Sequence, residues 1–202
     1  MNSLAYLALA VVMQAPADAV QTQFFPGGGF SDFEANWYGE ALTRMEEPPL
    51  AGSPRELKVF RFMLLPTWGH PVAVRLTIRD GQGTIEAKRL GGFGGYDPGM
   101  LVDSGSVSLS DAQVTAFLTL FGKLGFERLG TRDRERGKDG SEWILEAAEN
   151  GSYHVVVRWS PRDGTAKRGL TDFVAACEWL FRTSPLTGDA TNKSSIEISK
   201  KP

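Results

Sequence analysis

The chain has 202 residues, 42% of them hydrophobic, which is enough for one buried core and therefore for a single domain. The formal net charge of −2 argues against the basic surface by which nucleic-acid-binding proteins contact phosphates, so no nucleic-acid partner is expected. Two histidines and one cysteine, far apart in the sequence, exclude the ligand spacing of a zinc site, and no metal is expected.

The N-terminus has the pattern of a secretory signal peptide. Residues 4–13 form an apolar run, and Ala17-Asp18-Ala19 places small residues at the spacing of a cleavage site. The run is too short to span a bilayer as a helix. We therefore expect residues 1–19 to be removed, no membrane span in the mature chain, and a periplasmic or secreted protein. The alternative is a buried N-terminal helix, because no Lys or Arg precedes the apolar run.

A helix and several strands are predicted in the first half of the chain. Ser31 and Glu34 have capping-box spacing at the start of an apolar helical stripe that includes Phe33 and Trp37. The strand at 56–65 has apolar residues on both faces, as a central strand would. The expected elements are a helix at 32–46, strands at 56–65, 72–79 and 84–90, and a short fourth strand at 100–103.

The loop at 91–99, GGFGGYDPG, does not match a nucleotide-binding loop. The G-x-G-x-x-G pattern needs glycine where this chain has Asp97, and the loop follows strands instead of opening a β-α-β unit. We interpret it as a turn, and no cofactor is expected. A second capping box, Ser110 with Gln113, predicts a helix to Leu124. The basic segment 128–138 is interrupted by acidic residues and is interpreted as a solvated loop.

Asn150-Gly151 predicts a β-hairpin of residues 143–148 and 153–159. This dipeptide tolerates the positive φ values of a two-residue type I′ turn, and the turn sets the register. One face then carries Ile144, Glu146, Ala148, Tyr153, Val155, Val157 and Trp159, and the other carries Trp143, Leu145, Ala147, His154, Val156 and Arg158. Because both faces hold large apolar groups, both are expected to be covered, by the chain itself or by a partner.

A last helix is predicted at 171–182, with Cys177 as a buried and inert thiol on its apolar stripe. Residues 184–202 are polar and aperiodic and are expected to form a disordered tail, which leaves residues 20–183 as the domain. The element order indicates an α+β fold. We expect an antiparallel sheet of five to six strands, built from a three-stranded meander plus the C-terminal hairpin, with about three helices packed mainly on one face.

Glu146 and His154 are the candidates for catalysis. With His154 as base, Glu146 or Asp97 to orient it and a serine as nucleophile, the chain could form a small hydrolase. It lacks a G-x-S-x-G motif, however, and Glu146 and His154 fall on opposite hairpin faces. A buried Glu146 needs a cationic or hydrogen-bonding partner, and Arg61 is the expected one. Trp143 and Arg158, opposite each other, are expected to form a cation–π pair.

Three segments, DGSEWILE…YHVVVRWSP, FRFMLLPTWGHPVAVRL and GGFGGYDPG, resemble a family of uncharacterised exported bacterial proteins. The resemblance covers most of residues 33–182. It implies export but no activity, so it assigns no catalytic residue.

The favoured functional hypothesis is an exported, non-catalytic binding or accessory protein of the bacterial envelope, similar to an inhibitor or an immunity protein. A protein or small ligand would bind one sheet face through Trp143, Arg158 and His154, with Arg75 on the neighbouring strand, since aromatic and Arg side chains concentrate binding energy at interfaces. The alternatives are the hydrolase built around His154 and Glu146, and a structural envelope domain. This face could instead be covered by residues 24–30 or by the 91–99 loop.

Overall fold

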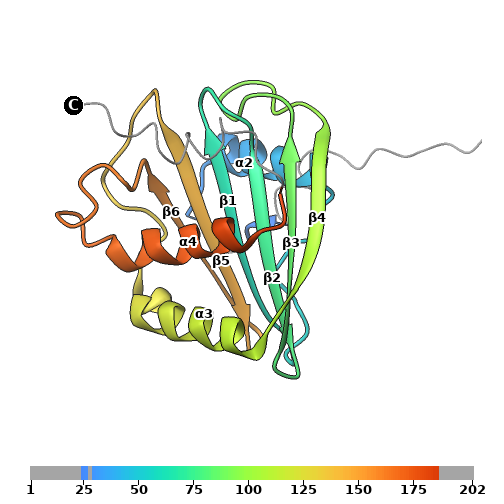
Figure 1. Cartoon of the computed structure of the whole chain (residues 1–202). Coiled ribbons are helices and arrows are strands. Elements are labelled where there is room, and N and C mark those ends of the chain that lie inside the picture. Colours follow the sequence, from blue (N-terminus) through green and yellow to red (C-terminus); the bar gives the residue numbers. More distant parts are fainter. Residues whose placement is uncertain (1–23, 27–28, 187–202) are drawn as a thin grey trace, which may run out of the picture.

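The computed structural model describes residues 24–26 and 29–186, so the predicted signal peptide and most of the predicted tail lie outside the described residues. Within these ranges the chain forms one antiparallel sheet of six strands and three α-helices, which confirms the predicted α+β class (Figure 1). The strands are β1 (Lys58–Pro66), β2 (Val72–Arg79), β3 (Gln82–Leu90), β4 (Leu101–Leu109), β5 (Ser141–Glu149) and β6 (Ser152–Trp159). The helices are α2 (Asp32–Arg44), α3 (Asp111–Leu124), α4 (Thr171–Thr183) and the short 3₁₀ helix η1 (Phe126–Arg128). None of the helices in the described ranges is both long and apolar enough to cross a membrane.

Strand β1 lies inside the sheet, as its two apolar faces predict. The strand order is β4-β3-β2-β1-β5-β6, so the chain forms a four-stranded meander and then pairs the β5–β6 hairpin with the other side of β1. Strand β4 has nine residues, whereas the sequence predicted only a short strand at 100–103. Its serines and glycine have weak strand propensity, and pairing along β3 supplies the stabilisation that the local sequence lacks.

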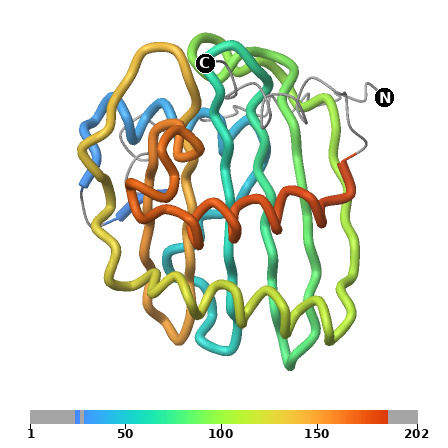
Figure 2. The backbone as a smooth tube through the Cα atoms, turned by 60° about the vertical axis from the view of Figure 1, so that its left-hand side comes forward, coloured from blue at the N-terminus to red at the C-terminus, as the bar shows by residue number. Residues whose placement is uncertain are grey.

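Helices α3 and α4 cover one face of the sheet (Figures 1 and 2). Phe117 of α3 and Phe173 of α4 are fully buried in a core that includes Phe60 and Phe62 of β1. Cys177 lies in the same core and is buried, as predicted. Burial raises the pKa of its thiol well above the ordinary value, which disfavours the reactive thiolate.

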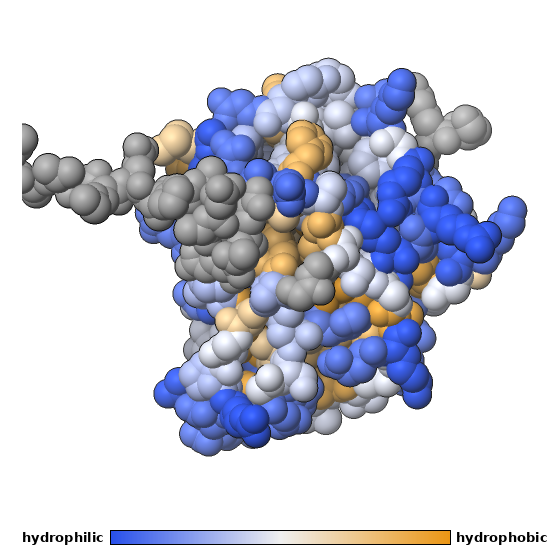
Figure 3. All heavy atoms as spheres, turned by 180° about the vertical axis from the view of Figure 1, so that it is seen from behind, coloured by the Kyte–Doolittle hydropathy of each residue, from blue (hydrophilic) through white to orange (hydrophobic). Residues whose placement is uncertain are grey.

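Helix α2 covers the opposite face, so the helices are divided between both faces of the sheet. Tyr38, Leu42 and Met45 belong to a core cluster with Met63 of β1 and Ile144 of β5. Figure 3 views the molecule from this side and shows hydrophobic residues along the middle of the face, with hydrophilic residues around them. Two layers are needed because both faces of β1 and β5 carry large apolar side chains.

Short sequence signals set the ends of the elements as predicted. The two capping boxes, at Ser31 and Ser110, are present, and Gly125 ends α3 with φ of 59°. Asn150 and Gly151 have φ of 56° and 81°, the positive values that a type I′ hairpin turn requires.

Candidate functional site

Trp143 and Arg158 lie inside the fold, beneath helix α4. Trp143 is 2% exposed, and its ring centroid lies 5.1 Å from that of Phe62. The Arg162 guanidinium lies over the Trp143 ring, 5.8 Å from the centroid. Arg158 lies instead over the ring of Phe173, at 5.8 Å, so the predicted cation–π pair between Trp143 and Arg158 is wrong although their register is as expected. Helices α3 and α4 therefore occupy the face on which a partner was expected.

Arg75 and His154 also make contacts within the fold, on opposite faces of the sheet. On the α2 face, Arg75 Nε donates to Glu47 at 2.9 Å. On the other face, His154 Nε2 donates to the carbonyl oxygen of Leu129 at 2.8 Å. The four residues predicted to bind a partner therefore do not form one site.

Glu146 has the partner that the sequence predicted. Arg61 is fully buried and donates from Nε and Nη2 to the two carboxylate oxygens, at 2.7 and 2.9 Å. The Tyr153 hydroxyl donates to Glu146 Oε1 at 2.9 Å. Because both oxygens are occupied and His154 lies on the other face, the pair considered for hydrolysis does not meet.

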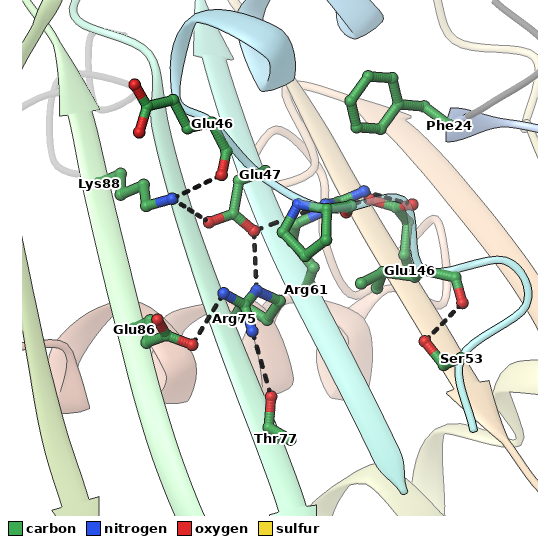
Figure 4. Close-up of polar contacts among 12 residues, drawn as sticks. Phe24, Glu46, Glu47, Ser53, Arg61, Arg75, Thr77, Glu86, Lys88 and Glu146 are labelled. Atoms are coloured by element: carbon green, nitrogen blue, oxygen red, sulfur yellow. Dashed lines mark hydrogen bonds and ion pairs between the residues drawn. The ribbon is translucent and has the colours of Figure 1, made fainter. Parts of the chain in front are cut away.

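The same cluster fixes the segment that follows α2 to the sheet (Figure 4). Arg61 Nη1 donates to the carbonyl oxygen of Pro48 at 2.7 Å and lies 3.5 Å from the buried carboxylate of Glu47. Arg75 and Lys88 also pair with Glu47, at 2.9 and 3.2 Å. The buried carboxylates of Glu47 and Glu146 thus have cationic partners within the fold, so we assign the cluster a structural role.

A cleft of about 730 Å³ lies where α2 meets the 91–99 loop and the segment before β5. We call it the aromatic cleft, because four of its lining side chains are Phe33, Trp37, Tyr96 and Trp159. Its charged lining residues are Glu40, Lys138, Asp139 and Glu142. Carboxylates thus outnumber cationic groups in this lining.

Glu142 is the buried acid of the aromatic cleft. Its side chain is 7% exposed, and its Oε1 atom lies 3.6 Å from Arg132 Nη1. Its Oε2 atom is buried and has no hydrogen-bond partner among the described residues. Burial raises the pKa of Glu142 above the ordinary value, although Arg132 and the Tyr38 hydroxyl lower it in part. An unsatisfied buried oxygen is costly, so a ligand donor would be stabilised there once the Glu142 carboxylate turns toward the cleft.

Arg132 positions this acid against α2. Its Nη2 atom lies 2.8 Å from Glu34 and donates to the Tyr38 hydroxyl at 2.7 Å, and its guanidinium lies over the rings of Phe30 and Tyr38. Burial, with the charge of Glu142, raises the pKa of Tyr38, so this hydroxyl stays neutral. The segment 128–138 was interpreted as a solvated loop, which is wrong for Arg132, whose side chain is 11% exposed.

The glycine-rich loop at 91–99 forms the rim of the aromatic cleft. The Trp37 indole nitrogen donates to the carbonyl oxygen of Gly94 at 2.6 Å, and Arg44 pairs with Asp97 at 2.7 Å. A Cβ atom at Gly94 would lie 2.7 Å from the carbonyl oxygen of Pro66, so a side chain there would push the loop away from β1. These contacts fix the predicted turn against α2 and β1, and the turn places Tyr96 in the lining of the aromatic cleft.

Two aromatic residues at this site, Phe33 and Trp68, are not predicted from the sequence as part of it. Helical periodicity places Phe33 on the apolar stripe of its helix, yet it is 74% exposed, and its ring is tilted against that of Trp37 with centroids 6.1 Å apart. Trp68, 63% exposed, extends the aromatic surface, since its ring lies 4.9 Å from that of Tyr96 and its indole nitrogen donates to Asp139. Exposed aromatic residues therefore come from three separate segments, at Phe33, Trp68 and Tyr96, and only the folded structure shows their exposure.

Comparison with known proteins adds no family assignment, because no family model matches the chain and no match is found among curated proteins. The resemblance to exported bacterial proteins therefore stays an expectation. Among the described residues, no group of three or more His, Cys, Asp or Glu side chains is arranged to hold a metal ion.

Proposed function

We propose that the protein is an exported, non-catalytic binding protein of the bacterial envelope, and that the aromatic cleft holds its ligand. The ligand is an organic cation with an N–H donor and an apolar or aromatic body. The observation that carries this proposal is the buried Glu142 Oε2 atom, which has no hydrogen-bond partner among the described residues.

The charge and the rings of the aromatic cleft favour a cation. Three carboxylates and one lysine line it, and although Glu40 and Glu142 pair with Arg44 and Arg132, the Oε2 atom of Glu142 keeps an unused acceptor for a cationic donor. Trp37, Tyr96 and Trp159 add π-systems whose faces attract an ammonium group within about 6 Å. The volume of about 730 Å³ also suits a small molecule.

The support for binding over catalysis comes from the two residues that suggested a hydrolase. Glu146 is paired with Arg61 on one face of the sheet, and His154 bonds to a backbone carbonyl on the other. Neither lines the aromatic cleft. The predicted signal peptide at residues 1–19 supports export.

A matched pair of probes tests the ligand class. Tryptophan fluorescence should show saturable binding of 2-phenylethylamine, with 2-phenylethanol, its neutral analogue, binding at least about tenfold more weakly, since hydrogen bonds to charged groups contribute about 1.5–3 kcal/mol. Glu142→Gln should remove the difference between the probes. Glu127→Gln, an exposed charge outside the cleft, should keep it. Equal binding of amine and alcohol, no binding of either, or an unchanged preference in Glu142→Gln would overturn the proposal.

A further inference from the structure

The two edges of the sheet are protected differently within the described residues. Along the edge strand β6, Val157 donates its backbone N–H to the carbonyl oxygen of Thr131 at 2.7 Å, and Arg132 forms a parallel bridge with the same residue. At the other edge, β4 pairs with β3 alone in this part of the chain. The outer backbone groups of β4 therefore form the open edge.

Strand β4 has few of the features that prevent an edge from pairing with another strand. Its sequence, LVDSGSVSL, contains no Lys, Arg or Pro, and its one register irregularity lies at its first residues, opposite Arg89 and Leu90. Val102 is 59% exposed, and Leu101 and Val107 are each 36% exposed. The one charged residue of β4, Asp103, pairs with Arg89 at 3.1 Å, and long exposed edges without prolines or free charges are templates for an added strand.

The C-terminal end of the described chain lies against this edge. Helix α4 crosses the sheet and its end reaches β4 (Figure 2). A Cβ atom at Gly105, in the middle of β4, would lie 3.0 Å from Cγ of Pro185, so the two residues are in close contact. Leu186 packs against the core of the α3/α4 face. The described chain therefore ends beside β4, and sixteen residues follow Leu186 in the sequence.

The sequence after Leu186 contains one segment with strand-like alternation. Residues 194–199 read Ser-Ser-Ile-Glu-Ile-Ser, which places Ile196 and Ile198 on the same side of an extended chain. Seven residues lie between Leu186 and Ser194, and the eight Cα–Cα steps that join the two reach up to roughly 26–29 Å. The distance from Gly105 to either end of β4 is four residues, or roughly 14 Å. The connection is long enough for the chain to turn and run along β4.

We propose that residues 194–199 pair with the outer edge of β4 of the same chain and form a seventh strand. Ile196 and Ile198 then lie on the side of Gly105 and Val107, where Pro185 and Leu186 already supply apolar neighbours. In this proposal the tail at residues 184–202, predicted to be disordered, contains the segment that covers the β4 edge. The proposal is independent of the ligand in the aromatic cleft.

Hydrogen exchange of the full chain tests this pairing. The β4 amides that do not bond to β3 should exchange at least about tenfold more slowly in the full chain than in a chain ending at Leu186, the scale of one backbone hydrogen bond. Ile196→Asp/Ile198→Asp should match the shortened chain. Ala190→Asp/Thr191→Asp, which adds the same charge outside the alternating segment, should match the full chain.

The oligomeric state, measured by light scattering on the same samples, identifies the occupant of the edge. A monomeric full chain with protected β4 amides supports pairing within the chain. A dimer whose dissociation exposes the β4 amides means that a second copy occupies the edge, which overturns the proposal. Equal exchange in the full and the shortened chain also overturns it.

Discussion

The guanidinium of Arg61 and the carboxylate of Glu146 form a two-point ion pair in which neither side chain is exposed to solvent. The pair joins β1 to β5 at directly opposed positions of the sheet, beneath the segment that follows α2. Because both groups are buried away from water, the attraction between the guanidinium and the carboxylate must offset a large desolvation cost. Removing either side chain leaves the charge of the other without its main partner.

Glu146→Gln should therefore lower the free energy of unfolding by about 3–5 kcal/mol, because Arg61 loses its two-point ion pair and keeps only the longer contact with Glu47, at 3.5 Å. Urea denaturation at neutral pH measures this change. The control is Glu149→Gln, also on β5, which breaks a partly exposed ion pair with Lys58 of β1. It should lower the free energy of unfolding by at most ~1 kcal/mol. Similar unfolding midpoints for the two variants would contradict the structural role assigned to Glu146.

Local patterns predicted this pair but could not say which layer covers it. Alternation along β5 and the Asn150-Gly151 turn determine which residues share a face, so a buried Glu146 facing a cationic neighbour followed from the register. The side on which each helix packs depends on how the connecting loops cross the sheet edge. For that reason Trp143 was expected at an interface, whereas α4 buries it.

The aromatic cleft could not be predicted from local patterns, because it too depends on how the helices and loops pack on the sheet. Phe33 and Trp37 come from α2, Tyr96 from a loop and Glu142 from β5, so only the tertiary arrangement brings them together. Periodicity assigned Phe33 to the core because it is one helical turn from Trp37. Exposure in the folded chain, which periodicity does not report, is what distinguishes a rim residue from a core residue.

Replacing glycine by alanine should have opposite effects on stability in the hairpin turn, at Gly151, and in helix α3, at Gly122. Gly151→Ala should destabilise the protein by about 1–2 kcal/mol, because φ is 81° there and a Cβ atom would lie 3.0 Å from Arg55 Nε. Gly122→Ala, inside α3 with no atom within 4 Å of the new Cβ, should stabilise it by about 0.5–1 kcal/mol. Thermal unfolding of both variants measures the signs, and a stabilising Gly151→Ala would refute the assigned turn.

Export is predicted from the signal-peptide pattern of residues 1–19. Mass spectrometry of the protein from its native cell should find a chain that begins near Val20, in the periplasmic or secreted fraction. An intact chain that begins at Met1 in the soluble cytoplasmic fraction would contradict both the signal peptide and the proposed envelope function.

Glu142 should give stability and ligand binding opposite dependences on pH. Burial raises the pKa of Glu142 in the folded chain above its value in the unfolded chain, so the folded state holds the proton more tightly. Its contribution to stability is then fully present below the unfolded pKa and is lost as the pH rises through the folded pKa. Glu142→Gln, neutral at every pH, should gain stability relative to the original chain over that interval.

Urea denaturation of both chains across this pH range measures the effect, with Glu127→Gln as the exposed control whose difference from the original chain should stay nearly constant. Binding of 2-phenylethylamine should change in the other direction, because the ionised carboxylate pairs with the ammonium group and protonation removes that pairing. Affinity should therefore fall as the pH drops through the raised pKa of Glu142. An original chain that becomes more stable relative to Glu142→Gln as the pH rises would show that Arg132, rather than burial, controls this acid, and the aromatic cleft would then have no unsatisfied charge to offer a cation.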